Sequence, residues 1–118
     1  MSDFDKEMEN FIQKVYESDI CREYFRQKEY IKQYPELKKQ IDNFRQRNYQ
    51  LQNETDSSIL FDEMDRFEQE YEEFRKNPIV SDFLAAELAF CRLYQRISNE
   101  LALAFAKRFD MVEQEEDA

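Results

Sequence analysis

The sequence predicts an all-α protein of about five helices, and three observations support this prediction. Glycine is absent from the 118 residues, and only two prolines occur, so few positions interrupt a helix. Good helix formers such as Leu, Glu, Lys, Gln, Arg and Ala fill the segments between polar breaks. No segment sustains the alternation of apolar and polar residues that is typical of a strand. We therefore expect one domain over 1–118, built as an antiparallel helical bundle or array with a long C-terminal helix.

The N-terminal part of the chain predicts two short helices. The first is expected over 3–17, because Ser2 can cap it and apolar residues recur along it at helical spacing. A polar break follows, in which Ser18 or Asp19 can cap a second helix over 20–33. This second helix should end before the first proline, because the residue that precedes a proline is pushed out of the helical region.

The middle of the chain predicts a helical hairpin. Pro35 opens a third helix at the first helical position, where its missing N–H costs nothing, and an apolar seam then continues to Leu51. A fourth helix follows a short polar loop and repeats the same seam at Leu60, Met64, Phe67, Tyr71 and Phe74. Two such seams joined by a short loop are typical of two antiparallel helices with coiled-coil-like packing.

The stretch NPIVSDFLAAEL (77–88) predicts the start of the last helix. Asn77 is a good N-cap, and Pro78 suits the first helical position. The helix is expected to reach about Phe109, and its apolar residues cover more than one narrow stripe. A helix that is apolar on so much of its circumference is normally buried by several neighbours, so we expect it to be the central element. The tail over 110–118 is expected to be frayed.

Charge is distributed unevenly around a net value of −10. Residues 20–50 carry eight basic and four acidic side chains, whereas residues 51–78 carry three basic and nine acidic ones. The candidate basic surface consists of Arg22, Arg26, Lys28, Lys32, Lys38 and Arg45. Its cations are either neutralised by the acidic fourth helix, in the same chain or in a partner, or used by segment 22–47 to contact RNA. An acidic chain makes nucleic-acid binding the less favoured of these interpretations.

The sequence does not provide the residues of a familiar active site. Histidine is absent, and so are the glycines that cradle phosphates in nucleotide-binding loops, so we do not expect an enzyme. Carboxylates are frequent, yet most fall on the outer faces of amphipathic helices. Glu87 and Glu100 on the last helix are the acids to examine for burial, and we expect each to be partly exposed or paired with Arg92 or Arg96.

The two cysteines do not indicate a cofactor. Cys21 and Cys91 are seventy positions apart and have none of the spacings of a zinc or iron–sulfur site. Both fall on apolar helical stripes, where a reduced cysteine behaves as a small buried hydrophobe. We therefore expect no metal and no other cofactor.

The length of the apolar runs and the extent of the apolar seams predict the location and the oligomeric state. No run approaches the ~18 apolar residues of a membrane span, and the acidic N-terminus lacks the basic region of a signal peptide, so a cytoplasmic protein is expected. The apolar seams exceed what two short N-terminal helices can cover, which predicts a homodimer. The candidate interface is the seam of the fourth helix, Leu60, Met64, Phe67, Tyr71 and Phe74. Spacing alone separates neither a dimer from a tetramer nor intrachain from intersubunit positions.

Two motifs carry a resemblance to a known family. The first lies in YPELKKQIDNFRQRN at Pro35, Leu37, Ile41 and Phe44. The second lies in NPIVSDFLAAELAFCRLYQRI at Asn77, Pro78, Val80, Phe83, Leu84, Ala86 and Glu87. With these motifs and the order of its helices, the chain resembles the YlbF/YmcA (YheA-like) family of small helical bacterial proteins over about 4–109.

The resemblance implies a non-enzymatic regulator that binds other proteins. Members of this family form complexes with one another that associate with ribonuclease Y and affect mRNA processing, competence, sporulation and biofilm formation. Some members are linked to iron–sulfur clusters through cysteine-rich segments, which this chain lacks. It therefore looks closer to the YheA-like branch, and the partnership with ribonuclease Y is an expectation from the family alone.

Overall fold

The computed structural model describes residues 2–54 and 56–109, which form five α-helices. They are α1 (Asp3–Glu17), α2 (Asp19–Ile31), α3 (Pro35–Gln52), α4 (Ser57–Phe74) and α5 (Pro78–Arg108). The predicted all-α class and the long C-terminal helix are confirmed. The expected fraying of the tail concerns 110–118, which lie outside the described residues.

The helix starts follow from the capping residues that the sequence provides. The Ser2 side chain accepts a hydrogen bond from the N–H of Asp5, and the Asn77 side chain accepts one from Ile79. Ser18 serves two helices, because its hydroxyl donates to the carbonyl of Val15 (2.6 Å) and accepts from the N–H of the third residue beyond it (3.3 Å). One serine thus ends α1 and begins α2, as an N-cap serine can.

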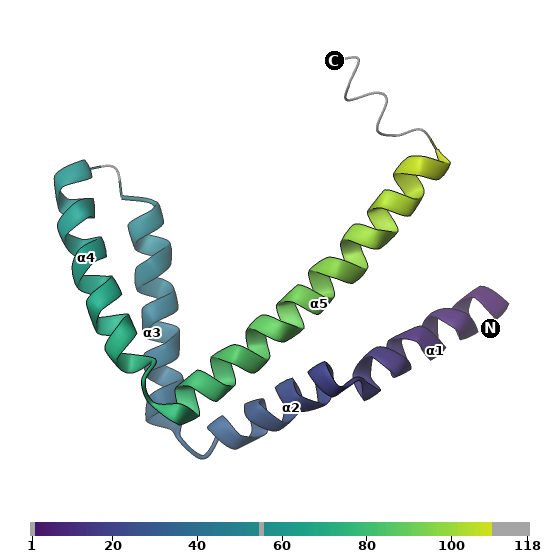
Figure 1. Ribbon diagram of the computed structural model, residues 1–118, viewed down its shortest axis with the longest axis horizontal. Coiled ribbons are helices and arrows are strands. Elements are labelled where there is room, and N and C mark those ends of the chain that lie inside the picture. Colours follow the sequence, from purple (N-terminus) through teal and green to yellow (C-terminus); the bar gives the residue numbers. More distant parts are fainter. Residues whose placement is uncertain (1, 55, 110–118) are drawn as a thin grey trace.

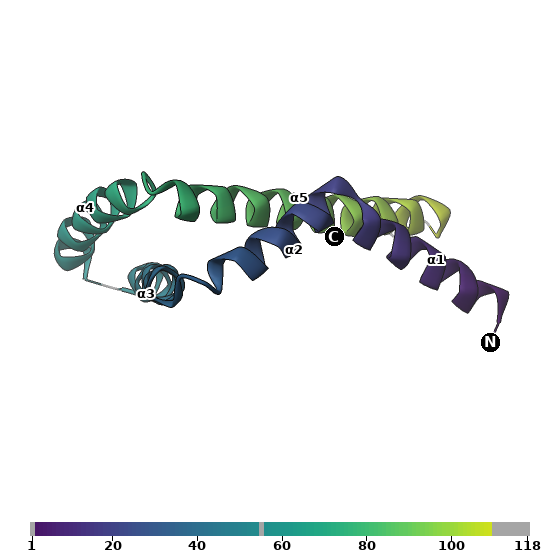
Figure 2. The same ribbon diagram turned by 90° about the horizontal axis from the view of Figure 1, so that it is seen from below.

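The five helices form an open V rather than a single compact bundle (Figure 1). One limb is the hairpin, which consists of the antiparallel helices α3 and α4. The other limb is the arm, in which α5 runs beside α2 and α1 continues from α2 toward the open end (Figures 1 and 2). The radius of gyration is 19.9 Å, against about 13 Å for a compact chain of this length.

The two limbs are joined by the apex cluster, defined as Ile31, Ile41, Val80 and Phe83. These four side chains are almost completely buried and come from α2, α3 and α5. Phe74 packs against them from the end of α4, so four helices meet at this point. Both prolines stand at the first helical position here, which lets the chain turn sharply on each side of the hairpin.

The hairpin closes its own apolar seam. The ring of Phe44 on α3 lies 4.9–5.7 Å from the ring centroids of Phe67, Tyr71 and Phe74 on α4. The guanidinium of Arg47 lies 5.4 Å from the ring centroids of both Phe44 and Phe67. Aromatic contacts of this kind stabilise a helix pair beyond the area that they bury.

The expectation that α5 is the central, covered element holds only for its first turns. Val80, Phe83 and Ala86 are buried there, whereas apolar residues of its second half, such as Leu101 and Phe105, are more than half exposed. The reason is the divergence of α1 from α5, which leaves the later turns of α5 poorly covered by the described part of the chain (Figure 1). Although α5 has 31 residues, no helix in the described ranges has the length and hydropathy to cross a membrane.

Candidate protein-interaction surfaces

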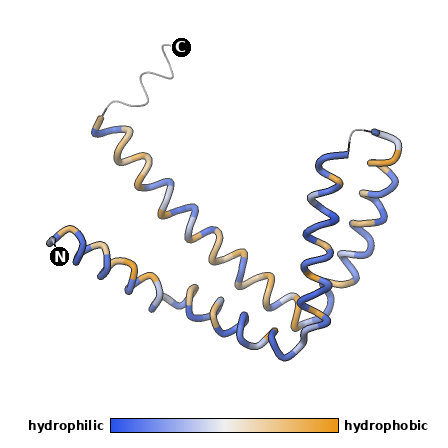
Figure 3. Tube along the Cα trace, turned by 180° about the vertical axis from the view of Figure 1, so that it is seen from behind, coloured by the Kyte–Doolittle hydropathy of each residue, from blue (hydrophilic) through white to orange (hydrophobic). Residues whose placement is uncertain are grey.

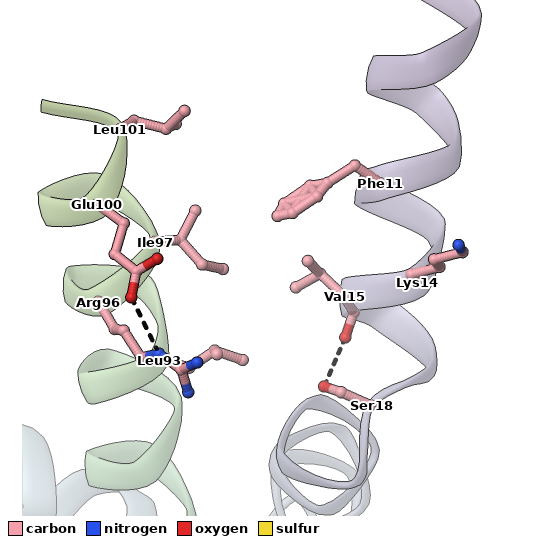
Figure 4. A pocket seen from close by; sticks show the side chains of 9 residues that line it. All are labelled: Phe11, Lys14, Val15, Ser18, Leu93, Arg96, Ile97, Glu100 and Leu101. Carbon is pink, nitrogen blue, oxygen red and sulfur yellow. Dashed lines mark hydrogen bonds and ion pairs between the residues drawn. The ribbon is translucent and has the colours of Figure 1, made fainter. Parts of the chain in front are cut away.

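The first candidate surface is the arm groove, an apolar groove of 580 Å³ between α1 and α5. Phe11 and Val15 point into it from α1, opposite Leu93 and Ile97 on α5 (Figure 4). Leu101 continues the apolar wall toward the open end, and polar side chains such as Lys14, Arg96 and Glu100 border the groove. Its lining is thus that of a helix–helix interface that has no third helix in it.

Further apolar side chains extend this surface beyond the groove. Phe4 and Met8 follow on the exposed part of α1, and Leu103 and Phe105 follow on α5. All are exposed because α1 and α5 separate as they leave the apex (Figure 1). A contiguous exposed apolar surface of a few hundred Å² generally marks a contact with another molecule.

The second candidate surface is the hairpin tip, defined as Ile59, Leu60, Phe61 and Met64 in the first two turns of α4. Phe61 is 76% exposed and Met64 41% exposed, and Figure 3 shows apolar residues at this end of the hairpin. Acidic side chains border the tip, and Asp65 and Glu68 line a shallow groove beside it. The tip lies far from the arm groove, at the other end of the molecule (Figure 1).

The predicted interface seam of α4 is divided between the inner face of the hairpin and the hairpin tip. Phe67, Tyr71 and Phe74 are half-buried and contact Phe44 within the chain. Leu60 and Met64 belong instead to the hairpin tip, where Leu60 is half-buried and Met64 is exposed. Whether residues of this seam contact a second chain stays a prediction.

Most of the predicted basic surface is paired inside the chain. Four of its six cations form ion pairs: Arg26 with Glu23, Lys32 with Glu29, Lys38 with Asp42, and Arg45 with Glu87. The ammonium group of Lys28 lies 5.3 Å from the ring centroid of Tyr24, and Arg22 lines a small pocket beside Phe25. The hydrogen bond from Gln27, followed by that from Arg26, lowers the pKa of Glu23, which favours its charged form.

The expected neutralisation by α4 therefore involves other residues. Arg47 pairs with Glu70 on α4 at 2.5 Å, whereas Arg45 pairs with Glu87 on α5. Glu87 is half-buried, which agrees with the expectation that it is partly exposed, and its ion-pair partner is Arg45 rather than Arg92 or Arg96. Contact with RNA through segment 22–47 stays a prediction.

The remaining polar candidates lie as follows. Glu100 is exposed and pairs with Arg96 at 3.7 Å, as expected. Cys21 is buried, as expected, but Cys91 is exposed, because neighbouring helices cover only part of α5. Within the described ranges, no three side chains of His, Cys, Asp or Glu are grouped so that they could hold a metal ion.

Two features of these surfaces were missed from the sequence. Arg47 follows Phe44 by three residues, a spacing that places a cation beside an aromatic ring on a helix and was available as a signal. The arm groove had no such signal, because it depends on the angle at which α1 diverges from α5. Periodicity fixes which face of a helix is apolar and leaves that angle undetermined.

A comparison with known families places both surfaces within one matched region. A family model described as "Control of competence regulator ComK, YlbF/YmcA" matches residues 5–104. This region includes the arm groove and the hairpin tip, and it reaches from the start of α1 to near the end of α5. No curated protein and no solved structure gives a significant match to the chain.

Proposed function

The chain belongs to the YlbF/YmcA family, and from this premise we propose that it is a non-enzymatic regulatory adaptor in the bacterial cytoplasm. The description of the family names the control of a regulator, ComK, which is a role that binding to another protein can perform. The chain acts by holding a second protein, whose activity or assembly then changes.

The observation that carries this proposal is the chemistry of the hairpin tip. Exposed apolar side chains stand there among carboxylates, at the end of a helix pair that is stabilised by its own aromatic contacts. Segment 51–78, which contains α4, carries three basic and nine acidic side chains. A partner suited to this surface presents a basic amphipathic helix, whose apolar face covers Phe61 while its cations meet the surrounding acids.

Ribonuclease Y is the partner that the family resemblance favours, together with other members of the family. Regulation of a ribonuclease through an adaptor explains an effect on mRNA processing without a catalytic site in this chain. The partner's binding site should lie on a basic segment, and binding should weaken as salt screens the charges.

Purified ribonuclease Y and the purified chain test the proposal in a direct binding assay. Phe61→Asp places a charge in the apolar part of the tip, and we expect it to weaken binding at least tenfold. The matched control is Phe25→Asp on α2, which changes a phenylalanine of similar exposure outside the tip and should bind like the wild type. Circular dichroism should show unchanged helix content for both variants.

Two results would overturn the proposal. One is a wild-type chain that binds neither ribonuclease Y nor another family member at micromolar concentration. The other is direct RNA binding that falls steeply with salt and is abolished by Arg22→Ala with Arg26→Ala, since that dependence is the signature of phosphate contacts. Partner binding that Phe61→Asp leaves unchanged would retain the adaptor and reject the hairpin tip as its contact.

A further inference from the structure

We propose that the ion pair between Arg45 and Glu87, here called the interlimb ion pair, holds the hairpin at a fixed angle to the arm. When this pair is broken, the hairpin swings as one body about the apex cluster. The pair acts in this way whichever protein binds the hairpin tip.

Packing between the two limbs is concentrated at the apex. The buried side chains of the apex cluster come from α2, α3 and α5, and Leu37, Phe74 and Leu84 pack against them. Beyond this point the hairpin and the arm diverge (Figure 1). The hairpin is held together by its own aromatic seam. A change of the angle between the limbs therefore repacks side chains near the apex and leaves the inside of the hairpin as it is.

The two connections of the hairpin suit such a rotation. Residues 32–34 join α2 to α3, and residues 75–77 join α4 to α5, so the chain attaches the hairpin to the arm at the apex end alone. Hinges commonly consist of a few residues at the ends of helices, because dihedral changes there rotate everything that lies beyond them. Both short connections are placed where a hinge of the hairpin would need them.

The interlimb ion pair lies one helical turn farther from the apex. Arg45 follows Ile41 of the apex cluster by four residues on α3, and Glu87 follows Phe83 by four residues on α5. Among the ion pairs of the described residues, this pair alone joins the two limbs, since the others lie within one helix or between α3 and α4. It is thus the charged contact that a wider angle between the limbs would break.

The arm holds its side of the pair in place. The ring of Tyr24 on α2 stacks on Phe90 with 4.8 Å between the ring centroids and contacts Phe83 at 6.5 Å, and these two residues flank Glu87 along α5. Burial, followed by the negative charge of Glu87, raises the pKa of Tyr24, which agrees with a carboxylate close to this ring. The Glu87 side chain is 23% exposed and that of Arg45 46% exposed. Solvent therefore screens their attraction less than that of a fully exposed pair.

A cavity beside the pair leaves room for the hairpin to move. It has a volume of 180 Å³ and lies between the hairpin and the first turns of α5. Its lining consists of Ile41, Phe44, Arg45, Asn48, Phe67 and Tyr71 of the hairpin and Leu84 of α5. Well-packed protein interiors contain few voids larger than a water molecule, so apolar packing does not fix the angle at this level of the V. The interlimb ion pair is the contact that remains to fix it.

Double electron–electron resonance on the full chain measures the distance between the limbs. One spin label is attached at Asp62→Cys on α4 and one at Ser98→Cys on α5, two exposed positions, in a chain that also carries Cys91→Ser. Cys21 is buried and stays unlabelled. An excess of unlabelled chain ensures that the two labels of each measured pair lie in one molecule. With the interlimb ion pair intact, the distance distribution should be narrow.

Substitutions at the pair should change this distribution. Glu87→Gln removes the attraction and should widen the distribution at least twofold, with a longer mean distance. The matched control is Glu70→Gln, which removes the partner of Arg47 within the hairpin and should leave the distribution unchanged. Arg45→Glu places like charges together and should widen the distribution further, whereas Arg45→Glu with Glu87→Arg should restore the narrow one. Circular dichroism should show the same helix content for all variants.

Salt tests the pair without a substitution in it. Raising the salt concentration from about 0.05 M to about 1 M shortens the range of charge interactions to roughly 3 Å. The distribution of the chain with the intact pair should then widen toward that of Glu87→Gln, whose own distribution should not change. This series decides the question if a substitution lowers the helix content.

Three results would overturn the proposal. A Glu87→Gln distribution identical to that of the intact pair would show that packing at the apex alone sets the angle. Equal widening by Glu70→Gln would assign the effect to a loosened hairpin. A charge-exchanged chain no narrower than Arg45→Glu would show that the attraction between these two side chains does not hold the limbs.

Discussion

The hairpin and the arm have similar apolar patterns, but only the hairpin covers most of its apolar face within the chain. Both present large apolar side chains at helical spacing, but α4 closes on Phe44 of α3, whereas α1 and α5 leave a groove between them. The difference lies in how much of the chain separates the two helices of each pair. Only residues 53–56 separate α3 from α4, so the two helices pack as a local unit, whereas α1 and α5 are joined through the whole remainder of the chain. Apolar spacing thus predicts a buried face, and chain connectivity decides whether the same chain buries it.

The largest expected effect is the loss of the junction between the two limbs. Phe83→Ala should lower the free energy of unfolding by about 3–5 kcal/mol, because it removes a buried aromatic side chain from the apex cluster. Urea denaturation followed by circular dichroism measures this loss. The control Phe61→Ala, at an exposed position, should change stability by less than about 0.5 kcal/mol. Equal losses for the two variants would contradict a core located at the apex.

A smaller effect should distinguish the apolar seam that α3 and α4 close within the chain from the open apolar surface of the arm. Phe44→Ala removes three aromatic contacts of a half-buried ring and should cost about 2–3 kcal/mol. Because these contacts lie within one chain, the loss of unfolding free energy should not depend on protein concentration. It should be the same at about 2 μM and about 200 μM protein. The Tm of the wild type should rise over that range. A Phe44→Ala cost that changes with concentration would place this seam between chains.

The Arg47 cation should contribute less to the free energy of unfolding than the Phe44 ring does. Arg47→Met keeps most of the side-chain packing but removes both the cation over Phe44 and Phe67 and the ion pair with Glu70, and should cost about 1 kcal/mol. Arg66→Met is the control, since Arg66 pairs with Glu63 on the exposed surface of α4 and its replacement should be nearly neutral. Chemical denaturation of both variants at low salt measures the difference in stability. Equal midpoints would show that the contacts of Arg47 add nothing to the stability of the hairpin.

The smallest effect concerns the loop that makes the hairpin possible. Asp56 caps α4, and the hydrogen bond from the Ser58 side chain, followed by those from the backbone N–H groups of Ile59 and Ser58, lowers its pKa. Its stabilising contribution is therefore present above its ordinary pKa and is lost as the pH falls through the lowered value. Asp56→Ala should lower the Tm by a few degrees at neutral pH and by less in acid. Asp56→Asn, which keeps the cap without a charge, should be less destabilised than Asp56→Ala and should share its pH profile, because neither variant carries the titrating carboxyl. A gap between the wild type and Asp56→Ala that does not shrink in acid would contradict this account.

The sequence predicts the elements of this fold far better than their coverage. Ser2, Asp56, Asn77 and the two prolines act through neighbours in the chain, so their roles at the helix starts could be read from residue types. Cys91 was expected to be buried, and it is exposed because coverage depends on distant elements. For the same reason the arm groove and the Arg45–Glu87 pair were not foreseen. The groove depends on the angle between α1 and α5, and the ion pair depends on the angle between the hairpin and the arm.

The helix α1 has no buried residue, although it is fully formed over 15 residues with a cap at each end. A helix of this length is only marginally stable in water by itself, so α1 in a lone chain has the character of a local unfolding unit. Its amide protons should exchange rapidly in dilute solution and become protected as the concentration rises, while those of α3 and α4 should not change. Folding of the N-terminus and formation of the predicted homodimer would then be a single thermodynamic event, and protein abundance would set the fraction of ordered α1 in the cell.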